Sequence, residues 1–366
     1  MLRISGIAAA ALTLLVLPAS AQSPTAQLDK IKLPAGFKID IFAEVPEARS
    51  MAVVPGLNAV FVGNRRGDKV YVAVDADRDG KAEEVKMIAS GLKSPNGVAW
   101  KDGYLYIGEQ HRIVRIPATD LKTIDGNNRE VVFEGLPDKS HHGWRYIGFD
   151  PKGHLYVTVG AACNICALQG MEGQILRIEN AKSFVAATGH RNSVGMDWHP
   201  KTGQMFFTDN GADNMGDNIP PDELNVLTAE GQDFGFPAYG GGDTKTKEFG
   251  AKATPDMVQP VVKFGAHVAA LGIHFYRGDS FPQDYRTDAF VAQHGSWNRS
   301  QPDGYRVMRI KMEADGKVIG AEPFAEGWLE GRSSWGRPVD VKELPDGSLL
   351  VSDDSGGRIY RISYAK

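Results

Sequence analysis

A short strand pattern that recurs along the chain most limits how the chain can fold. Each copy has a turn, usually with a glycine, then a short apolar and aromatic strand, and then a small or polar residue. Several copies lead into a second strand with alternating apolar residues. Because strands and turns recur without helical periodicity, the chain is predicted to be all-β. The copies lie at residues 55–63, 101–108, 150–160, 201–209, 285–293 and 345–353.

The spacing of these copies predicts a six-bladed β-propeller. Most strand ends are about 45 to 60 residues apart, and blades at such a period stack radially because one blade cannot bury both faces of its sheet. Residues 22–366 are therefore predicted to form one propeller domain, and a β-sandwich is the alternative. The longest interval leaves room for an insertion around residues 240–266, a rim loop in which we expect substrate choice to lie.

The first 21 residues are predicted to be a secretory signal peptide. Arg3 gives a positive start, residues 7–17 are apolar, and residues 19–21 fit an A-x-A cleavage pattern. The apolar stretch is too short to cross a bilayer, and no later segment reaches about 18 consecutive apolar residues. We therefore expect export to the periplasm and no membrane span in the mature chain. A retained N-terminal anchor is the alternative.

The charge balance argues against nucleic acid as a partner. The chain has 41 Lys and Arg residues and 45 Asp and Glu residues, a net charge of −4, and the two signs are interspersed. A protein that binds nucleic acid would normally carry clustered positive charge. We therefore expect no nucleic-acid partner.

The two cysteines, Cys163 and Cys166, are three residues apart. In an exported protein, a local disulfide that staples a loop is the main interpretation. A metal site completed by outside ligands and a redox pair remain alternatives, because two thiols alone cannot complete a zinc site.

An acidic loop at residues 75–80 resembles the first half of an EF-hand. Asp75, Asp77 and Asp79 alternate and are followed by Gly80, an arrangement in which carboxylates can converge on one hard cation. The twelfth position of an EF-hand should be Glu, but it is Lys86 here. The loop is a candidate second calcium site in another geometry, or an acidic turn without an ion.

Four clusters of polar residues lie at the edges of successive repeats. A propeller would place them on a common rim. Two neighbouring histidines, His141 and His142, can take a proton near neutral pH, and Arg191 with Asn192 can donate to an anionic, carbonyl-rich ligand. The clusters are residues 139–145, 189–195, 294–299 and 335–340.

These clusters resemble those of the soluble quinoprotein sugar dehydrogenases, and most closely the L-sorbosone dehydrogenase-like and aldose sugar dehydrogenase members. The resemblance runs from about residue 33 to residue 362. It implies a six-bladed propeller that binds pyrroloquinoline quinone (PQQ) and calcium. It also implies oxidation of an aldose or sorbosone-like sugar at C1 by hydride transfer to PQQ, with a periplasmic electron acceptor such as a cytochrome as partner.

The resemblance also implies residue roles. His141, Gly143 and Arg145 match the stretch that holds the catalytic base, so His141 is the expected base and His142 the reserve. Arg191 would stabilise charge on the quinone oxygen. The remaining expected contacts to the quinone are Asn192, His294, Trp297 and Arg337, and the expected calcium ligands are the backbone carbonyls of Gly211 and Ala212.

Two departures from the glucose-oxidising branch matter. That branch has Asp before the base, where this chain has Ser140, and a Lys near the fifth blade, where this chain has residues 294–299. Quinone anchoring must therefore differ there, and a preference for glucose is not implied.

Two other functions remain open. A calcium-dependent lactonase of the gluconolactonase type is also a six-bladed propeller, and Asn96 within residues 94–100 would be a metal ligand there. A propeller without catalysis that binds a partner or glycan is the second alternative. It would explain the fold but not the basic groups gathered from several blades.

Overall fold

The computed structural model describes residues 25–365. The predicted signal peptide, residues 1–21, lies outside the described residues and stays a prediction. Among residues 25–365, no helix is long and apolar enough to cross a membrane.

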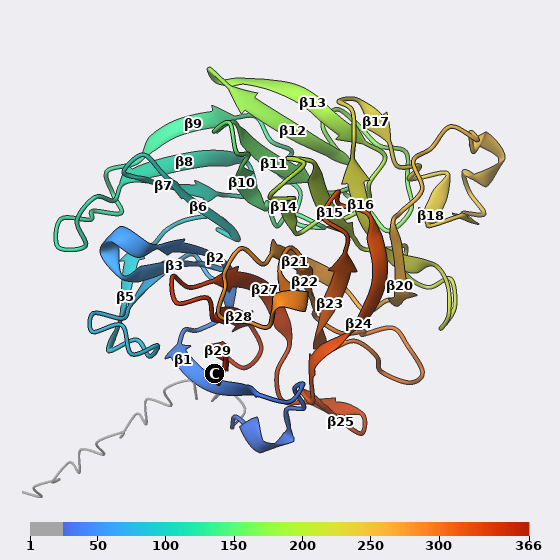
Figure 1. Ribbon diagram of the computed structural model, residues 1–366. Coiled ribbons are helices and arrows are strands. Elements are labelled where there is room, and N and C mark those ends of the chain that lie inside the picture. Colours follow the sequence, from blue (N-terminus) through green and yellow to red (C-terminus); the bar gives the residue numbers. More distant parts are fainter. Residues whose placement is uncertain (1–24, 366) are drawn as a thin grey trace, which may run out of the picture.

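Six sheets form the blades of a propeller (Figure 1), so the predicted fold class is confirmed. In each blade, antiparallel strands run outward from the central channel. Blade 1 contains β2 (Ala48–Val54), β3 (Ala59–Asn64), β4 (Val70–Val74) and β5 (Glu84–Ala89). Blade 2 contains β6 (Gly97–Lys101), β7 (Tyr104–Gly108), β8 (Arg112–Pro117) and β9 (Glu130–Glu134). Blade 3 contains β10 (Ile147–Phe149), β11 (Leu155–Val159), β12 (Gln174–Glu179) and β13 (Lys182–Thr188), with the short β17 (Gln232–Asp233) at its edge.

The last three blades carry the insertion and the chain ends. Blade 4 contains β14 (Met196–Trp198), β15 (Met205–Asp209), β16 (Pro221–Leu227) and β20 (Val262–Ala266). Blade 5 contains β21 (Ala270–Phe275), β22 (Ala289–Gln293), β23 (Arg306–Met312) and β24 (Val318–Glu326). Blade 6 contains β27 (Pro338–Glu343), β28 (Leu349–Asp353), β29 (Arg358–Tyr364) and β1 (Phe37–Glu44). Two small hairpins, β18 (Tyr239–Gly241) with β19 (Thr244–Lys245) and β25 (Leu329–Glu330) with β26 (Ser333–Ser334), lie outside the blades.

The six strands predicted from the repeat are the second strands of the six blades: β3, β7, β11, β15, β22 and β28. These strands are buried because they have a paired strand on either side and a neighbouring blade against each face. Their apolar side chains form clusters between blades, such as the one that joins Phe61 of β3 to Leu105 of β7. The repeat was visible in the sequence because this burial demands apolar residues at the same place in every blade.

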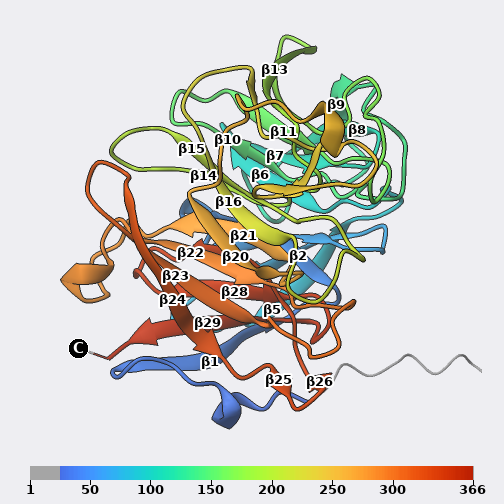
Figure 2. The same cartoon turned by 90° about the vertical axis from the view of Figure 1, so that its right-hand side faces the viewer.

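The ring is closed by pairing the two ends of the described chain. β1, which precedes blade 1, pairs antiparallel with β29 from Phe37–Tyr364 to Glu44–Arg358. Figures 1 and 2 show β1 and β29 side by side in both views. Because β1 is the outer strand of blade 6, the closing blade depends on both ends of the chain.

Cys163 and Cys166 form a disulfide in the loop between β11 and β12, as predicted. No helix follows the pair, so the setting differs from that of a thioredoxin-like redox site.

Candidate active site

A cavity of about 650 Å³ opens at one mouth of the central channel. It is built from loops that lead into the innermost strands and from residues that follow the second strands. Eight residues expected from the sequence line it: His141 and the reserve His142, Arg191, Asn192, Gly211, His294, Trp297 and Arg337. Ala212 is not among the lining residues. Asp75, Asp77 and Asp79 lie elsewhere, between β4 and β5.

The insertion at residues 240–266 contributes no residue to the lining of this cavity. It supplies a small hairpin and β20, the outer strand of blade 4, and an outer strand lies far from the channel. The expectation that substrate choice depends chiefly on this insertion is therefore not supported. The exposed part of the lining comes instead from residues such as Arg66, His141 and Trp297.

The innermost strands connect this cavity to a second one, of about 270 Å³, further along the channel. On β21, Leu271 lines the first cavity and His274 the second. Arg337 lines the first cavity directly before β27, and Lys342 on β27 lines the second. The larger cavity therefore lies at the beginnings of the innermost strands.

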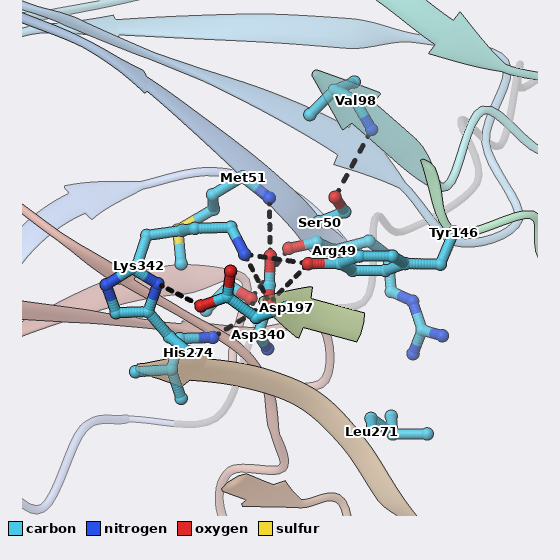
Figure 3. A network of polar contacts seen from close by, with 12 residues as sticks. Arg49, Ser50, Met51, Val98, Tyr146, Asp197, Leu271, His274, Asp340 and Lys342 are labelled. Atoms are coloured by element: carbon cyan, nitrogen blue, oxygen red, sulfur yellow. Dashed lines mark hydrogen bonds and ion pairs between the residues drawn. The ribbon is translucent and has the colours of Figure 1, made fainter. Parts of the chain in front are cut away.

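A polar network occupies the channel beyond the larger cavity (Figure 3). Lys342 Nζ donates to Tyr146 Oη at 2.7 Å and lies 3.3 Å from Asp340 Oδ1, and Asp340 Oδ2 accepts from the Met51 N–H at 2.9 Å. Burial opposes the charge of Lys342, but Asp340 and Tyr146 outweigh burial and raise the pKa of Lys342. These bonds join blades 1, 3 and 6 across the channel.

Arg191 is held in the cavity wall by five hydrogen bonds. Nη1 donates to the carbonyls of Asn210 at 3.2 Å and Gly211 at 2.8 Å, and Nε donates to the carbonyl of Asn164 at 2.9 Å. Nη2 donates to Asn164 Oδ1 at 2.8 Å and to Asp213 Oδ2 at 2.7 Å. The guanidinium is thus fixed in direction before any ligand arrives.

In two blades, an aspartate at the end of the second strand binds the backbone N–H of an arginine that lines the cavity. Asp209, at the end of β15, accepts from the backbone N–H of Arg191 at 2.8 Å. Asp353, at the end of β28, accepts from the backbone N–H of Arg337 at 2.9 Å. Because both carboxylates lie at the same place in their blades, the repeat itself brings Arg191 and Arg337 to one rim.

Arg337 and His294 form one unit on the other side of the cavity. Arg337 Nε donates to the carbonyl of His294 at 2.9 Å, and Nη2 donates to the carbonyl of Gly295 at 2.5 Å. His294 Nε2 donates to Asp354 Oδ1 at 2.7 Å. Burial lowers the pKa of His294 to about 3 although Asp354 opposes this, so the ring is neutral at physiological pH.

Asp354 also holds two arginines of blade 1. Arg49 Nη1 lies 3.1 Å and Arg65 Nη1 3.3 Å from Asp354 Oδ2. Burial disfavours the charge of Asp354, but His294, Arg49 and Arg65 outweigh burial and hold the pKa of Asp354 below its usual value. The guanidiniums of Arg49 and Arg65 also lie 5.8 Å and 5.7 Å from the ring centre of Trp144, within range of a cation–π contact.

The two histidines of the 139–145 cluster have different environments. His142 is buried, and its Nδ1 donates to the carbonyl of Ala161 at 2.8 Å. His141 is exposed to the cavity, and burial followed by the charge of Arg191 lowers its pKa. His141 is therefore neutral at pH 7 and able to accept a proton. Arg145 points away from the cavity and donates to the carbonyls of Gln110 at 3.0 Å and Pro137 at 2.6 Å, so it braces the loop.

The cavity is suited to a flat, anionic ligand. Five arginines line it, against the two carboxylates Asp213 and Asp222. Burial raises the pKa of Asp222 to about 7, which further limits negative charge. At the rim, the Trp297 indole is 70% exposed and offers a flat apolar surface. The arginines are Arg49, Arg65, Arg66, Arg191 and Arg337.

The expected calcium ligands form an incomplete set. The Gly211 carbonyl already accepts from Arg191, and Ala212 does not line the cavity. Calcium takes about six to eight oxygen ligands. A calcium ion in this cavity would therefore need further oxygen ligands beyond these two carbonyls.

Comparison with known proteins decides the family. Residues 104–361 match the family model described as Glucose / Sorbosone dehydrogenase. The chain belongs to this family. An uncharacterized protein of Borreliella burgdorferi is 35% identical to this dehydrogenase-family chain over 353 residues, which cover 92% of this chain and 91% of that protein.

Two matches involve the pyrroloquinoline quinone-dependent pyranose dehydrogenase of Coprinopsis cinerea. The curated protein is 26% identical to this family member over 261 residues, which cover 62% of this chain and 32% of that protein. The holo form of its PQQ domain is a solved structure with a TM-score of 0.77 and 19% identity, covering 94% of this chain and 99% of that one. That likeness shows the shared propeller fold.

Sequence reasoning missed several residues of this candidate site, chiefly Arg49, Arg65 and Asp354. The repeat contains a signal that would have found two of them. Arg65 directly follows β3 and Asp354 directly follows β28, the same place in the blade as Asn210 after β15 and His294 after β22. The residue that directly follows the second strand lies at the channel in these four blades. These equivalent residues should therefore be compared with one another when site residues are predicted from the sequence.

The lactonase alternative loses its expected ligand. Asn96 is 1% exposed, its Oδ1 accepts from Arg49 Nε at 2.8 Å, and its Nδ2 donates to the Arg145 carbonyl at 3.0 Å. Both ends of this amide are engaged, so Asn96 holds the arginine and not a metal.

Proposed function

We propose that this protein is a periplasmic quinoprotein that oxidises an aldose or a sorbosone-like sugar at C1, with PQQ as its cofactor and calcium beside it. The observation that carries the proposal is the set of five arginines around one cavity that also contains a neutral histidine and an exposed tryptophan. PQQ is a flat ring system with three carboxylates, and arginine binds carboxylates through two parallel hydrogen bonds.

The arginines would bind and orient the cofactor. Arg337, Arg49 and Arg65 are fixed on one side by Asp354 and by backbone carbonyls, so they would hold carboxylates at low entropic cost. The five N–H groups of Arg191 are engaged on the other side of the cavity, so Arg191 would stabilise negative charge on a quinone oxygen through its positive charge. Bound PQQ supplies the two-electron acceptor and bound calcium a Lewis acid.

His141 would remove the proton from the C1 hydroxyl of the sugar. A general base must be unprotonated and must reach the substrate, and His141 is neutral and exposed to the cavity. His142 is the reserve: its Nδ1 carries a proton for Ala161, which leaves Nε2 as the acceptor, but its ring is buried. Trp297 at the rim would cover part of the bound ligand.

Export and electron transfer belong to the same proposal. The signal peptide predicted at residues 1–21 favours a periplasmic location, where reduced cofactor would pass electrons to an acceptor such as a cytochrome. The sugar class rests on the family match to glucose/sorbosone dehydrogenases.

The test is dye reduction by the purified mature protein. A panel of aldoses and sorbosone is assayed with and without PQQ and calcium, alongside the absorption spectrum of added PQQ. We expect turnover only when PQQ and calcium are both present. No turnover and no spectral shift would reject the quinoprotein function, and hydrolysis of a sugar lactone with calcium alone would favour a lactonase.

A further inference from the structure

Four carboxylates meet in the loop between β4 and β5, outside the cavity. One oxygen from each of Asp75, Asp77, Asp79 and Glu83 lies within 4.8 Å of the others. Asp77, Asp79 and Glu83 are exposed, whereas Asp75 is only 8% exposed. Among the ion pairs of residues 25–365, none joins these four carboxylates to a lysine, arginine or histidine.

Asp75 provides a second observation, independent of the acidic cluster. Its Oδ2 accepts from the Gly80 N–H at 3.1 Å, but its buried Oδ1 has no hydrogen-bond partner among the described residues. A buried carboxylate oxygen without a partner costs free energy that a bound cation would offset.

We propose that residues 75–83 bind one calcium ion, separate from the ion expected beside PQQ. Calcium prefers hard oxygen ligands, and carboxylates at alternating positions before a glycine can converge on it. Gly80 takes a φ of +89°, which allows the sharp turn. Glu83 is the fourth carboxylate of the cluster and would take the place of the missing twelfth-position Glu. Lys86 at that position pairs with Glu84 at 2.9 Å.

Of the two basic residues inside this loop, Arg78 and Lys81, Arg78 is engaged elsewhere. Arg78, with a φ of +61°, donates through Nε to Asn58 Oδ1 at 2.8 Å. Its charge therefore does not replace a cation among the four carboxylates. Arg78 binds Asn58, and the four carboxylates remain close to one another. A metal site requires such a group of carboxylates without a neutralising side chain.

The site lies at the seam where the ring closes. The Ala82 N–H donates to the carbonyl of Phe42 on β1 at 2.8 Å. Gly80 lies against Arg361 on β29, so closely that a Cβ at Gly80 would lie 2.5 Å from the Arg361 guanidinium carbon. A calcium ion that orders residues 75–83 would therefore stabilise the contact between blade 1 and blade 6.

The test uses the mature protein without PQQ, stripped of metal by a chelator. Calcium binding is measured by calorimetry, and thermal unfolding is followed with and without calcium. We expect one calcium ion to bind without PQQ and to raise the melting temperature by several degrees. No binding, or binding without a change in melting temperature, would overturn the proposal.

A matched pair of double variants assigns the binding to this loop. Asp77→Asn/Asp79→Asn removes two ligand charges, and each Asn keeps an acceptor for the turn hydrogen bonds to Asp79 and Lys81. Asp120→Asn/Asp125→Asn makes the same change in another exposed loop with equivalent turns. We expect calcium affinity to fall at least tenfold in the first variant and to be unchanged in the second.

The same variants separate this site from the proposed function. Asp77→Asn/Asp79→Asn should still bind PQQ with its spectral shift, because the cavity does not contain these residues. Unchanged calcium affinity and melting temperature in that variant would reject the loop site while leaving the quinoprotein proposal intact.

Discussion

Asn164 Oδ1 accepts from Arg191 Nη2 at 2.8 Å, and Asn164 lies inside the loop that the Cys163–Cys166 disulfide closes. The Asn164 carbonyl accepts from Nε of the same arginine. His141 forms a hydrogen bond with the backbone of Cys163, and this bond favours the protonated form of His141. The disulfide loop thus supports both residues that we place at the reacting atoms. The disulfide, predicted only to close a loop, therefore also helps to position Arg191 and His141 in the site.

Removing the disulfide should therefore weaken the site. In Cys163→Ser/Cys166→Ser, we expect PQQ affinity and turnover each to fall roughly tenfold, because Arg191 loses a fixed partner worth about 1.4 kcal/mol. Asn164→Ala should reproduce the loss of PQQ affinity with the disulfide intact. The measurement is PQQ titration by its spectral shift, followed by steady-state dye reduction. Unaltered affinity in both variants would show that the loop does not position Arg191.

Arg337 should be required for holding the cofactor. Arg337→Gln removes a charge that is fixed by two backbone carbonyls, and charge-assisted hydrogen bonds contribute about 1.5–3 kcal/mol. We expect PQQ affinity to fall about 10- to 100-fold while the melting temperature of the PQQ-free protein changes little. Arg286→Gln, at an exposed position after the turn at residues 283–285, is the matched control and should leave affinity unchanged.

His141 should matter for turnover and not for cofactor binding. In His141→Asn, we expect turnover to fall about 10²- to 10⁴-fold, the usual contribution of a positioned general base. The spectral shift on adding PQQ should persist, because the arginines remain. If turnover survives in His141→Asn and is lost in His142→Asn, the reserve histidine is the base.

The pH dependence should follow the lowered pKa of His141. Burial and the charge of Arg191 favour the neutral ring, and a base is active in its neutral form. We therefore expect kcat/KM to remain constant as the pH falls through 6.5, the ordinary value for histidine, and to decline only below it. The check is a pH profile of the enzyme loaded with PQQ and calcium. A decline that begins above pH 6.5 would contradict this environment for His141.

Asp354 should be the residue that mainly stabilises the group formed by Arg49, Arg65 and His294. Asp354→Asn removes the carboxylate shared by Arg49, Arg65 and His294, and breaking a buried ion pair costs about 3–5 kcal/mol. We expect the melting temperature of the PQQ-free protein to drop by several degrees. Asp138→Asn, which breaks an exposed pair with Lys93, should melt close to the unaltered protein. Equal melting of the two variants would show that this group is not held by Asp354.

The sequence determined the propeller because burial acts on every blade alike. The second strands β3, β7, β11, β15, β22 and β28 each need apolar residues at the same place, so a single chain displays the fold as a period. It also determined much of the rim: Arg191, Arg337 and His294 stand beside those strands, where repeat position alone brings them together.

Only the tertiary structure decided how the charges are shared. The sequence singles out Arg145 and not Arg49, yet Arg145 donates to the carbonyl of Pro137. Arg49 instead lines the cavity and binds Asp354, 305 residues further along the chain. Asn96, the metal ligand expected for a lactonase, instead forms hydrogen bonds with the Arg49 side chain and the Arg145 carbonyl. The hydrogen-bond partners of a side chain buried around the central channel come from other blades. The sequence next to that side chain does not contain these partners, so they cannot be predicted from it.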